Sequence, residues 1–142
     1  MPPDLTFHFI RKADAATLNC IITLYRTQGW WSRSDKPELL PRIINGSHCF
    51  VLAEREGRII GMGRAISDGV SDAYIQDVAV KKEYRGLGLG SKIVRGLKSR
   101  LKADGIKWVG LIAQNDSHAF YESLGFKVVK RAQPMILKAN HV

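Results

Sequence analysis

The sequence predicts an α/β fold in which a central, mixed and mostly antiparallel sheet carries helices on both faces. Helical and strand-like apolar patterns alternate along the 142 residues, without a repeat or a linker-like stretch. Three strand patterns separated by turns form a meander between residues 49 and 80, and a strand–helix–strand pattern follows to residue 113. A chain of this length is typical of one domain, so we expect residues 1–142 to form a single domain.

The first half of the chain supplies a strand, two helices and the meander. Asp14 is a typical N-cap ahead of an apolar stripe at helical spacing, and Pro37 opens a second short helix. The pairs Glu56-Gly57 and Asp68-Gly69 are turn signals that bound the second meander strand. The expected elements are a strand over 5–11, helices over 14–28 and 37–46, and strands over 49–54, 58–67 and 74–80.

The second half is expected to begin with an amphipathic helix. Its apolar side carries Ile93, Val94, Leu97 and Leu101, and Asp104-Gly105 ends it. A buried strand over 107–113, a short helix over 116–124 and two last strands over 126–131 and 135–138 complete the expected fold.

Composition bounds the class of protein. Apolar content of 45% and charged content of 25% are ordinary for a globular protein. No apolar run has the length of a membrane span, and the N-terminus shows no signal-peptide pattern. Cys20 and Cys49 have no metal or redox spacing, so we expect reduced thiols in a cytoplasmic protein, with no metal and no membrane partner.

The most informative motif is a run of alternate glycines, Gly86, Gly88 and Gly90, between a strand pattern and a basic helix. Glycine lets the backbone approach a ligand closely, and the first N–H groups of a helix bind anions. A P-loop would need a Gly-Lys pair, which does not follow this loop. A dinucleotide fingerprint would need a glycine where Ser91 stands. The sequence therefore predicts a phosphate-bearing ligand of another class.

Positive charge gathers around this loop. The net charge is +9, and the residues from 81 to 107 include nine basic and two acidic side chains. Such a cluster suits nucleic acid or a polyanionic cofactor, and some of these side chains form a solvated helix face under either interpretation.

The spacing Arg85-x-x-Gly88-x-Gly90 resembles the pyrophosphate-binding loop of the GNAT superfamily of acetyl-CoA-dependent N-acetyltransferases. Two further segments add to the resemblance: Val78-Ala79-Val80 before the loop, and Ala119-Phe120-Tyr121-x-x-x-Gly125-Phe126 after it. The resemblance covers essentially the whole chain. It implies the GNAT fold, with the strands over 74–80 and 107–113 splayed at the CoA site. It also implies direct transfer of acetyl from acetyl-CoA to a primary amine of a small molecule or a protein.

The resemblance assigns roles to individual residues. Tyr121 becomes the general acid for the leaving thiolate, a role that suits a phenol with an ordinary pKa of about 10. Asn115 lies six residues before Tyr121, where many members have seven, so a turn or N-cap role is an equal alternative. The implied cofactor-binding residues are Val78, Ala79, Val80, Arg85, Gly86, Leu87, Gly88, Leu89, Gly90, Ser91, Asn115 and Tyr121.

The amine side of the site is less defined. Asp77 lies in an otherwise apolar strand, and it is either the catalytic base or a carboxylate held by a neighbouring arginine or by backbone amides. A water chain is an alternative base. The expected acceptor-binding residues are Tyr25, Trp30, Trp31 and Gln76. Adjacent tryptophans cannot both face the core from one element, so we expect one in the core and one exposed.

Two other functions stay open from the sequence. One is an acyl-CoA sensor of the same fold without turnover, and the other is a basic nucleic-acid-binding module. Tyr121 beside an intact glycine loop favours catalysis. The sequence has no helix-turn-helix, RNA-recognition or zinc pattern, which counts against specific nucleic-acid binding. Members of the superfamily often dimerise, so a homodimer is a further expectation from the resemblance.

Overall fold

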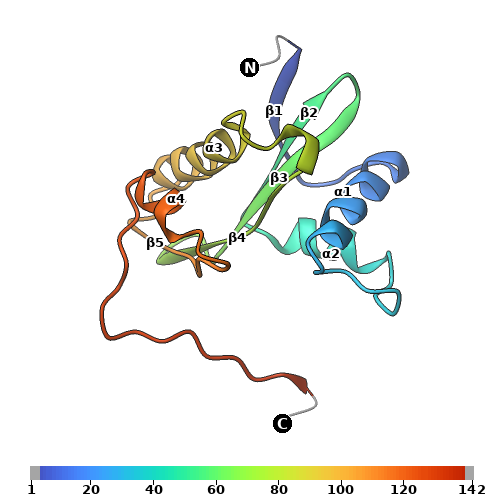
Figure 1. Cartoon of the computed structure of the whole chain (residues 1–142). Helices are drawn as coiled ribbons and strands as arrows, with labels where there is room; N and C mark the ends of the chain where they lie inside the picture. Colours follow the sequence, from blue (N-terminus) through green and yellow to red (C-terminus); the bar gives the residue numbers. More distant parts are fainter. Residues whose placement is uncertain (1–3, 140–142) are drawn as a thin grey trace. The chain divides into compact units, whose positions relative to one another are not determined.

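A five-stranded sheet forms the centre of the fold (Figure 1). The computed structural model describes residues 4–139, and its contacts divide the chain after Leu111 into two compact units. The described strands belong to the first unit: β1 (Leu5–Ile10), β2 (Cys49–Arg55), β3 (Arg58–Ser67), β4 (Asp72–Val80) and β5 (Trp108–Gly110). They lie in the order β1-β2-β3-β4-β5, with three antiparallel pairings followed by a parallel β4–β5 pairing. The predicted mixed, mostly antiparallel sheet is therefore confirmed.

Helices α1 (Ala15–Thr27) and α2 (Leu39–Gly46) cover one face of this sheet. The Asp14 carboxylate accepts a hydrogen bond from the Thr17 N–H at 2.8 Å, so it is the N-cap that the sequence predicts. A single apolar core joins the two helices to alternate residues of the strands. Its fully buried members include Ile21, Leu24, Leu40, Ile44, Phe50, Leu52 and Met62.

Helix α3 (Leu89–Ala103) covers the opposite face, and two glycines of β3 allow its close approach. A Cβ atom on Gly63 would lie 2.7 Å from Ile93 Cγ2 and 3.1 Å from Leu97 Cδ1. At Gly61 it would lie 2.9 Å from Ile93 Cδ1. Helix α3 and the sheet thus pack so closely that no side chain fits at Gly61 or Gly63, on the face of β3 that contacts the helix. Between β4 and α3, residues Lys82–Tyr84 form the short 3-10 helix η1.

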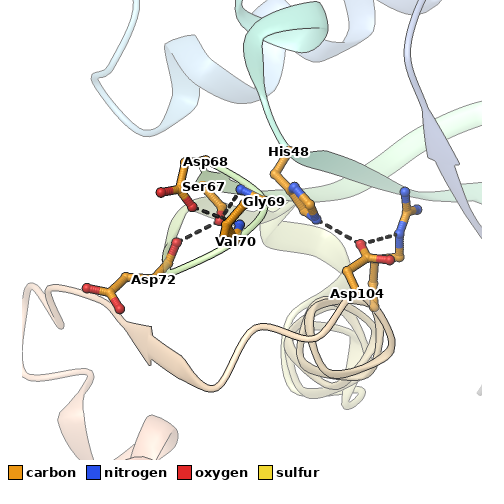
Figure 2. A network of polar contacts seen from close by, with 8 residues as sticks. His48, Ser67, Asp68, Gly69, Val70, Asp72 and Asp104 are labelled. Carbon is orange, nitrogen blue, oxygen red and sulfur yellow. Dashed lines mark hydrogen bonds and ion pairs between the residues drawn. The ribbon is translucent and has the colours of Figure 1, made fainter.

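A hydrogen bond joins the residue after α3 to the residue before β2 (Figure 2). His48 Nε2 lies 2.7 Å from Asp104 Oδ2, and Arg100 Nε donates to the same oxygen at 3.0 Å. The hydrogen bond with His48, followed by that with Arg100, lowers the pKa of the Asp104 carboxyl. The Asp68 carboxylate accepts from the N–H groups of Val70 and Ser71, both at 2.8 Å. Figure 2 draws the contact with Val70. These bonds lower the Asp68 pKa to about 2 and fix the β3–β4 turn.

The second unit differs from its predicted structure. It contains one short helix, α4 (His118–Glu122), and residues 126–131 and 135–138 form no strand. Both strand predictions are wrong for this structure, and the apolar side chains there are exposed by more than half: Val128, Val129, Met135, Ile136 and Leu137. A strand needs a hydrogen-bonded neighbour, and an apolar pattern does not specify which edge supplies one.

The strand predicted over 107–113 is also shorter than expected. Only Trp108–Gly110 pairs with β4, and the segment is not buried, because Trp108 is 49% exposed and Ile112 is 60% exposed. The Trp108 ring folds back over Gly110, where a Cβ atom would lie 2.7 Å from Trp108 Cη2. The Tyr74 ring packs against that of Trp108 at 5.4 Å in a T-shaped arrangement. This aromatic pair closes the end of the β4–β5 ladder.

Candidate active site

Residues 85–91, called the glycine loop below, comprise the link from η1 to α3 and the first three residues of α3. Gly86 and Gly88 both have φ of +81°, in the left-handed region that side chains disfavour. Gly88 is the N-cap of α3, and no side chain caps this helix. The first N–H groups of a helix lack intrahelical partners, so the backbone at Leu89, Gly90 and Ser91 offers donors to an anion. This is the backbone geometry that a phosphate cradle requires.

Arg85 ties the glycine loop to the end of the neighbouring strand. Its Nε donates to the carbonyl oxygen of Val80 at 3.1 Å. Two basic side chains of α3 lie over aromatic rings of β1. Lys92 Nζ is 6.0 Å from the centre of the Phe7 ring, and Arg100 Cζ is 5.1 Å from the centre of the Phe9 ring. Part of the positive charge on α3 therefore contacts β1 rather than the glycine loop.

The outer edge of β4 is open beside the glycine loop. The ladder between β4 and β5 runs from Asp72↔Trp108 to Tyr74↔Gly110 and ends there. From residue 75 to residue 80, β4 has no strand partner on this side among the described residues. An open edge presents a row of backbone N–H and C=O groups that an extended ligand can pair with. Val78, Ala79 and Val80 lie on this stretch.

A group of polar side chains, called the Asp77 cluster below, meets at Asp77 of the same strand. It consists of Tyr25, Ser47, Arg64, Gln76 and Asp77. Asp77 Oδ2 accepts hydrogen bonds from the Tyr25 hydroxyl at 2.8 Å and from Arg64 Nε at 2.5 Å. Arg64 also donates to Ser47 Oγ at 3.3 Å and to Gln76 Oε1 at 3.2 Å. Burial, followed by the charge of Asp77, raises the pKa of Tyr25 well above its ordinary value, so its hydroxyl keeps the proton.

Aromatic rings continue from the Asp77 cluster toward the surface. The Tyr25 ring lies 5.7 Å from that of Trp31 and 6.2 Å from that of Trp30. Trp31 is 8% exposed and Trp30 is 40% exposed, which confirms that one tryptophan is in the core and the other is not. The buried Nε1 of Trp31 has no hydrogen-bond partner among residues 4–139. Gln76 is exposed, and its amide is oriented by Arg64.

Asn115 and Tyr121 belong to the second unit and are described by themselves. Asn115 and Asp116 have φ of +55° and +58°, so they form a turn ahead of α4. The Tyr121 ring packs edge-on against Phe120 at 4.9 Å and Phe126 at 5.9 Å. Burial raises the pKa of the Tyr121 phenol. The phenol therefore holds its proton throughout the neutral range.

Arg64 and Ser47 are the members of the Asp77 cluster that the sequence analysis missed. Arg64 interrupts the buried run of β3, in which residues 59–63 are all buried. An arginine in such a run needs a partner for its charge, and this is the signal that could have identified it. Ser47 carries no comparable signal, because a serine directly after a helix is common.

These features define an α/β protein with a backbone-built anion cradle next to an open strand edge. The comparisons with known proteins agree with this description. The family model described as "Acetyltransferase (GNAT) family" matches residues 18–126 and thereby spans parts of both units. The chain belongs to the GNAT acetyltransferase family.

Individual relatives support this assignment. The chain is 34% identical over 101 residues to an uncharacterized N-acetyltransferase, ycf52, of Pyropia yezoensis, covering 69% of this chain and 58% of that protein. It is 37% identical over 70 residues to serotonin N-acetyltransferase 2, chloroplastic, of Oryza sativa, covering 49% of this chain and 35% of that protein. The matched part thus spans less than two thirds of either relative. An acetyltransferase candidate from Deinococcus radiodurans R1 has a similar structure, with a TM-score of 0.77, 32% identity and coverage of 96% and 90% of the two chains.

The described residues have the features of neither a membrane-spanning segment nor a metal site. Within residues 4–139, no helix combines the length and the apolar character needed to cross a bilayer. The same residues contain no group of three or more His, Cys, Asp or Glu side chains arranged to hold a metal ion. Cys20 and Cys49 are free thiols, and burial raises the pKa of Cys49. The rice relative is named as chloroplastic, and the cytoplasmic location expected from the sequence stays a prediction.

Proposed function

We propose that this protein transfers an acetyl group from acetyl-CoA directly to a primary amine of a small molecule or a protein. One observation supports the proposal most: the glycine loop begins α3 directly beside the open edge of β4. The first feature suits a pyrophosphate and the second suits an extended arm that carries amide groups. Pyrophosphate and pantetheine are the two parts of CoA that need such partners.

The glycine loop and β4 divide the binding of the donor between them. Backbone N–H groups from Arg85 to Ser91 bind the pyrophosphate. Leu87 in this loop is 48% exposed, so the loop lies at the protein surface, where a ligand can reach it. Val78, Ala79 and Val80 pair with the pantetheine along the β4 edge as an added strand would. The Val78 N–H faces the acetyl carbonyl and stabilises the negative charge that develops on its oxygen.

Tyr121 and the amine complete the chemistry in this proposal. The neutral amine nitrogen forms a bond to the acetyl carbon, and the carbon–sulfur bond breaks. The sulfur takes a proton from the Tyr121 phenol, which recovers it from solvent. Burial keeps this phenol protonated and ready to donate. Because a thiol pKa near 8.5 lies below that of the phenol, the transfer itself is uphill, and it is completed when solvent returns a proton to the phenolate at neutral pH.

The proton that the amine loses has two destinations, the Asp77 carboxylate or a chain of water molecules. Asp77 Oδ2 already accepts from Tyr25 and Arg64, so its contacts support the alternative in which the carboxylate is held by a neighbouring arginine. A water chain then carries the proton to solvent. Rates measured against pH separate the two, because loss of a catalytic carboxylate changes the acid limb of the profile and loss of a positioning residue does not.

Trp30, Gln76 and the ring of Tyr25 are proposed to bind the acceptor. An exposed indole that packs against the Tyr25 ring suits an ammonium group, because an aromatic face attracts a cation. The named substrate of the rice relative, serotonin, is an aromatic primary amine of this kind. Aromatic amines therefore belong in the test panel beside polyamines, aminosugars and lysine peptides.

Release of free CoA across this amine panel tests the proposed function. We expect thiol release from acetyl-CoA with at least one amine, together with one equivalent of the acetylated amine by mass spectrometry. Binding of acetyl-CoA without release in any member of the panel would contradict the enzymatic proposal and favour an acyl-CoA sensor. We expect a DNA or RNA duplex at physiological salt to leave acetyl-CoA binding unchanged. We also expect a homodimer, and light scattering on the same preparation tests this.

A further inference from the structure

The Asp77 cluster fixes an irregular backbone segment of β4. Met62 pairs with Ala79 and Arg64 pairs with Gln76, so Gly63 alone lies opposite both Asp77 and Val78. This extra residue is a β-bulge, in which the ladder is locally interrupted. Asp77 has φ of +57°, a left-handed conformation that most residues with a side chain disfavour, although Asp and Asn adopt it more readily than the others. Contacts of the Asp77 side chain therefore help to hold the backbone in this region.

Those contacts come from two elements, α1 and β3. Tyr25 reaches Asp77 Oδ2 from α1 and Arg64 reaches it from β3. The side chains of Arg64 and Asp77 are 15% and 20% exposed, so the ion pair is largely shielded from water. Arg64 is itself oriented by Ser47 Oγ, and the Ser47 hydroxyl donates to the carbonyl oxygen of Ile43 at 2.6 Å. The chain of contacts thus runs from the end of α2 through β3 to the bulge.

The bulge matters because Val78 follows Asp77 directly. Val78 has no one-to-one partner in the register with β3, and β5 pairs only with residues 72–74. Its peptide plane is therefore set by the conformation of Asp77 and not by a regular ladder. The direction of the Val78 N–H depends on whatever holds Asp77 in the left-handed region.

We propose that Arg64, with Tyr25 and Ser47, is a positioning device that holds Asp77 left-handed and so aims the Val78 N–H at the acetyl carbonyl. The inference rests on the proposed function for the identity of the carbonyl. Asp77 then contributes through its backbone conformation. Its carboxylate binds Arg64 and Tyr25, and these contacts keep the backbone in that conformation. Arg64 is a positioning residue and contacts no reacting atom.

Substitutions at Asp77 separate backbone conformation from carboxylate chemistry. Asp77→Gly removes the carboxylate but adopts the left-handed region freely, whereas Asp77→Ala removes the carboxylate and disfavours that region. Asp77→Asn keeps a side chain that tolerates it. We expect turnover in the Gly and Asn variants at least tenfold above that of the Ala variant, with an unchanged acid limb. Equal loss in all three would overturn the proposal and assign the carboxylate itself to catalysis.

The second arm changes Arg64. Arg64→Met is expected to lower turnover about tenfold while the affinity for free CoA stays within about twofold, and Arg64→Lys is expected to recover part of the loss. Adding Arg64→Met to Asp77→Gly should cost less than twofold, because glycine no longer needs the clamp. Arg58→Met, on the same strand outside the cluster, is the matched control and should leave turnover unchanged. A full tenfold loss in the double variant would contradict the proposed coupling.

A readout without turnover keeps this inference distinct from the proposed function. The backbone amide of Val78 gives a signal in the nitrogen–proton spectrum of the labelled protein, and melting temperatures confirm that each variant is folded. We expect this signal to move when Arg64→Met is introduced into the wild-type protein, but to stay in place when Arg64→Met is added to Asp77→Gly. An unmoved signal in the Arg64→Met single variant, or an equal shift in both backgrounds, would overturn the positioning role. Absence of CoA release by the wild-type protein would instead contradict only the proposed function.

Discussion

The glycine loop and the Asp77 cluster lie in the same unit but are built by different means. At the loop, the groups available to a ligand are backbone N–H groups, fixed by the left-handed conformations of Gly86 and Gly88. In the cluster, side chains from α1 and β3 meet at one carboxylate oxygen of β4. A backbone-built site tolerates new side chains wherever φ is preserved, whereas a side-chain-built site loses its geometry when a partner is removed. The two regions should therefore respond to different substitutions.

The largest effect is expected from Tyr121→Phe, because this residue belongs to neither region and is proposed to act only in the chemical step. Turnover should fall by about 10² or more, the usual range for loss of general acid catalysis, while acetyl-CoA affinity changes less than twofold. The pKa of Tyr121 is raised, so its acid form persists through neutral pH and the wild-type rate should show no alkaline loss there. Single-turnover kinetics and calorimetric titration measure the two quantities. Unchanged turnover would remove Tyr121 from the mechanism.

The two tryptophans next to the Asp77 cluster should differ sharply. Trp31→Ala removes a buried ring and should lower the free energy of unfolding by about 3–5 kcal/mol. Trp30→Ala is the matched control at an exposed position, and we expect it to raise the KM for the amine with little change in stability. Urea denaturation and steady-state kinetics measure these effects. A larger loss of stability in Trp30→Ala would mean that the two roles are reversed.

At the glycine loop, Gly88→Ala tests whether backbone conformation makes the site. Alanine is strained at φ of +81°, so the affinity for acetyl-CoA should fall about tenfold while saturating turnover changes little. Gly96→Ala is the control within α3, because a Cβ atom there meets nothing within 4 Å. It should be neutral or stabilising by up to about 1 kcal/mol. Equal losses of affinity in the two variants would show that the conformation of Gly88 is not what binds the donor.

The smallest effect is expected at the Asp68 turn, because Asp68 has no proposed role in binding or catalysis. The folded-state pKa of Asp68 is lowered to about 2 from an ordinary value of 3.8, so its stabilising effect is complete above pH 4. It is lost as pH falls from about 4 toward 2, when the carboxylate gains a proton. Asp68→Ala should lower the melting temperature slightly at pH 7 and weaken its decline over that acid window. An identical decline in both proteins would show that Asp68 does not contribute.

The same contrast explains what could be predicted from the sequence. A left-handed backbone position usually needs glycine, so Gly86 and Gly88 indicate the loop from a few adjacent letters. Tyr25 and Asp77 are separated by 52 residues, and Arg64 and Asp77 by 13, so their contacts depend on how α1 and β3 pack against β4. The meander and the long helix were predicted because each has a strong periodic pattern. The strands over 126–131 and 135–138 were not found, because periodicity indicates burial only where a neighbour is available.

Acetyl-CoA binding by the wild-type protein, beside Gly88→Ala and Gly96→Ala, tests the central claim most directly. The claim is that the glycine loop and the open β4 edge hold the donor. At 100 times its Kd, acetyl-CoA should stabilise the wild-type protein and Gly96→Ala by about 2.7 kcal/mol, seen as a higher melting temperature. Gly88→Ala should show a clearly smaller rise at the same concentration. No rise in the wild-type protein at millimolar acetyl-CoA would contradict the account.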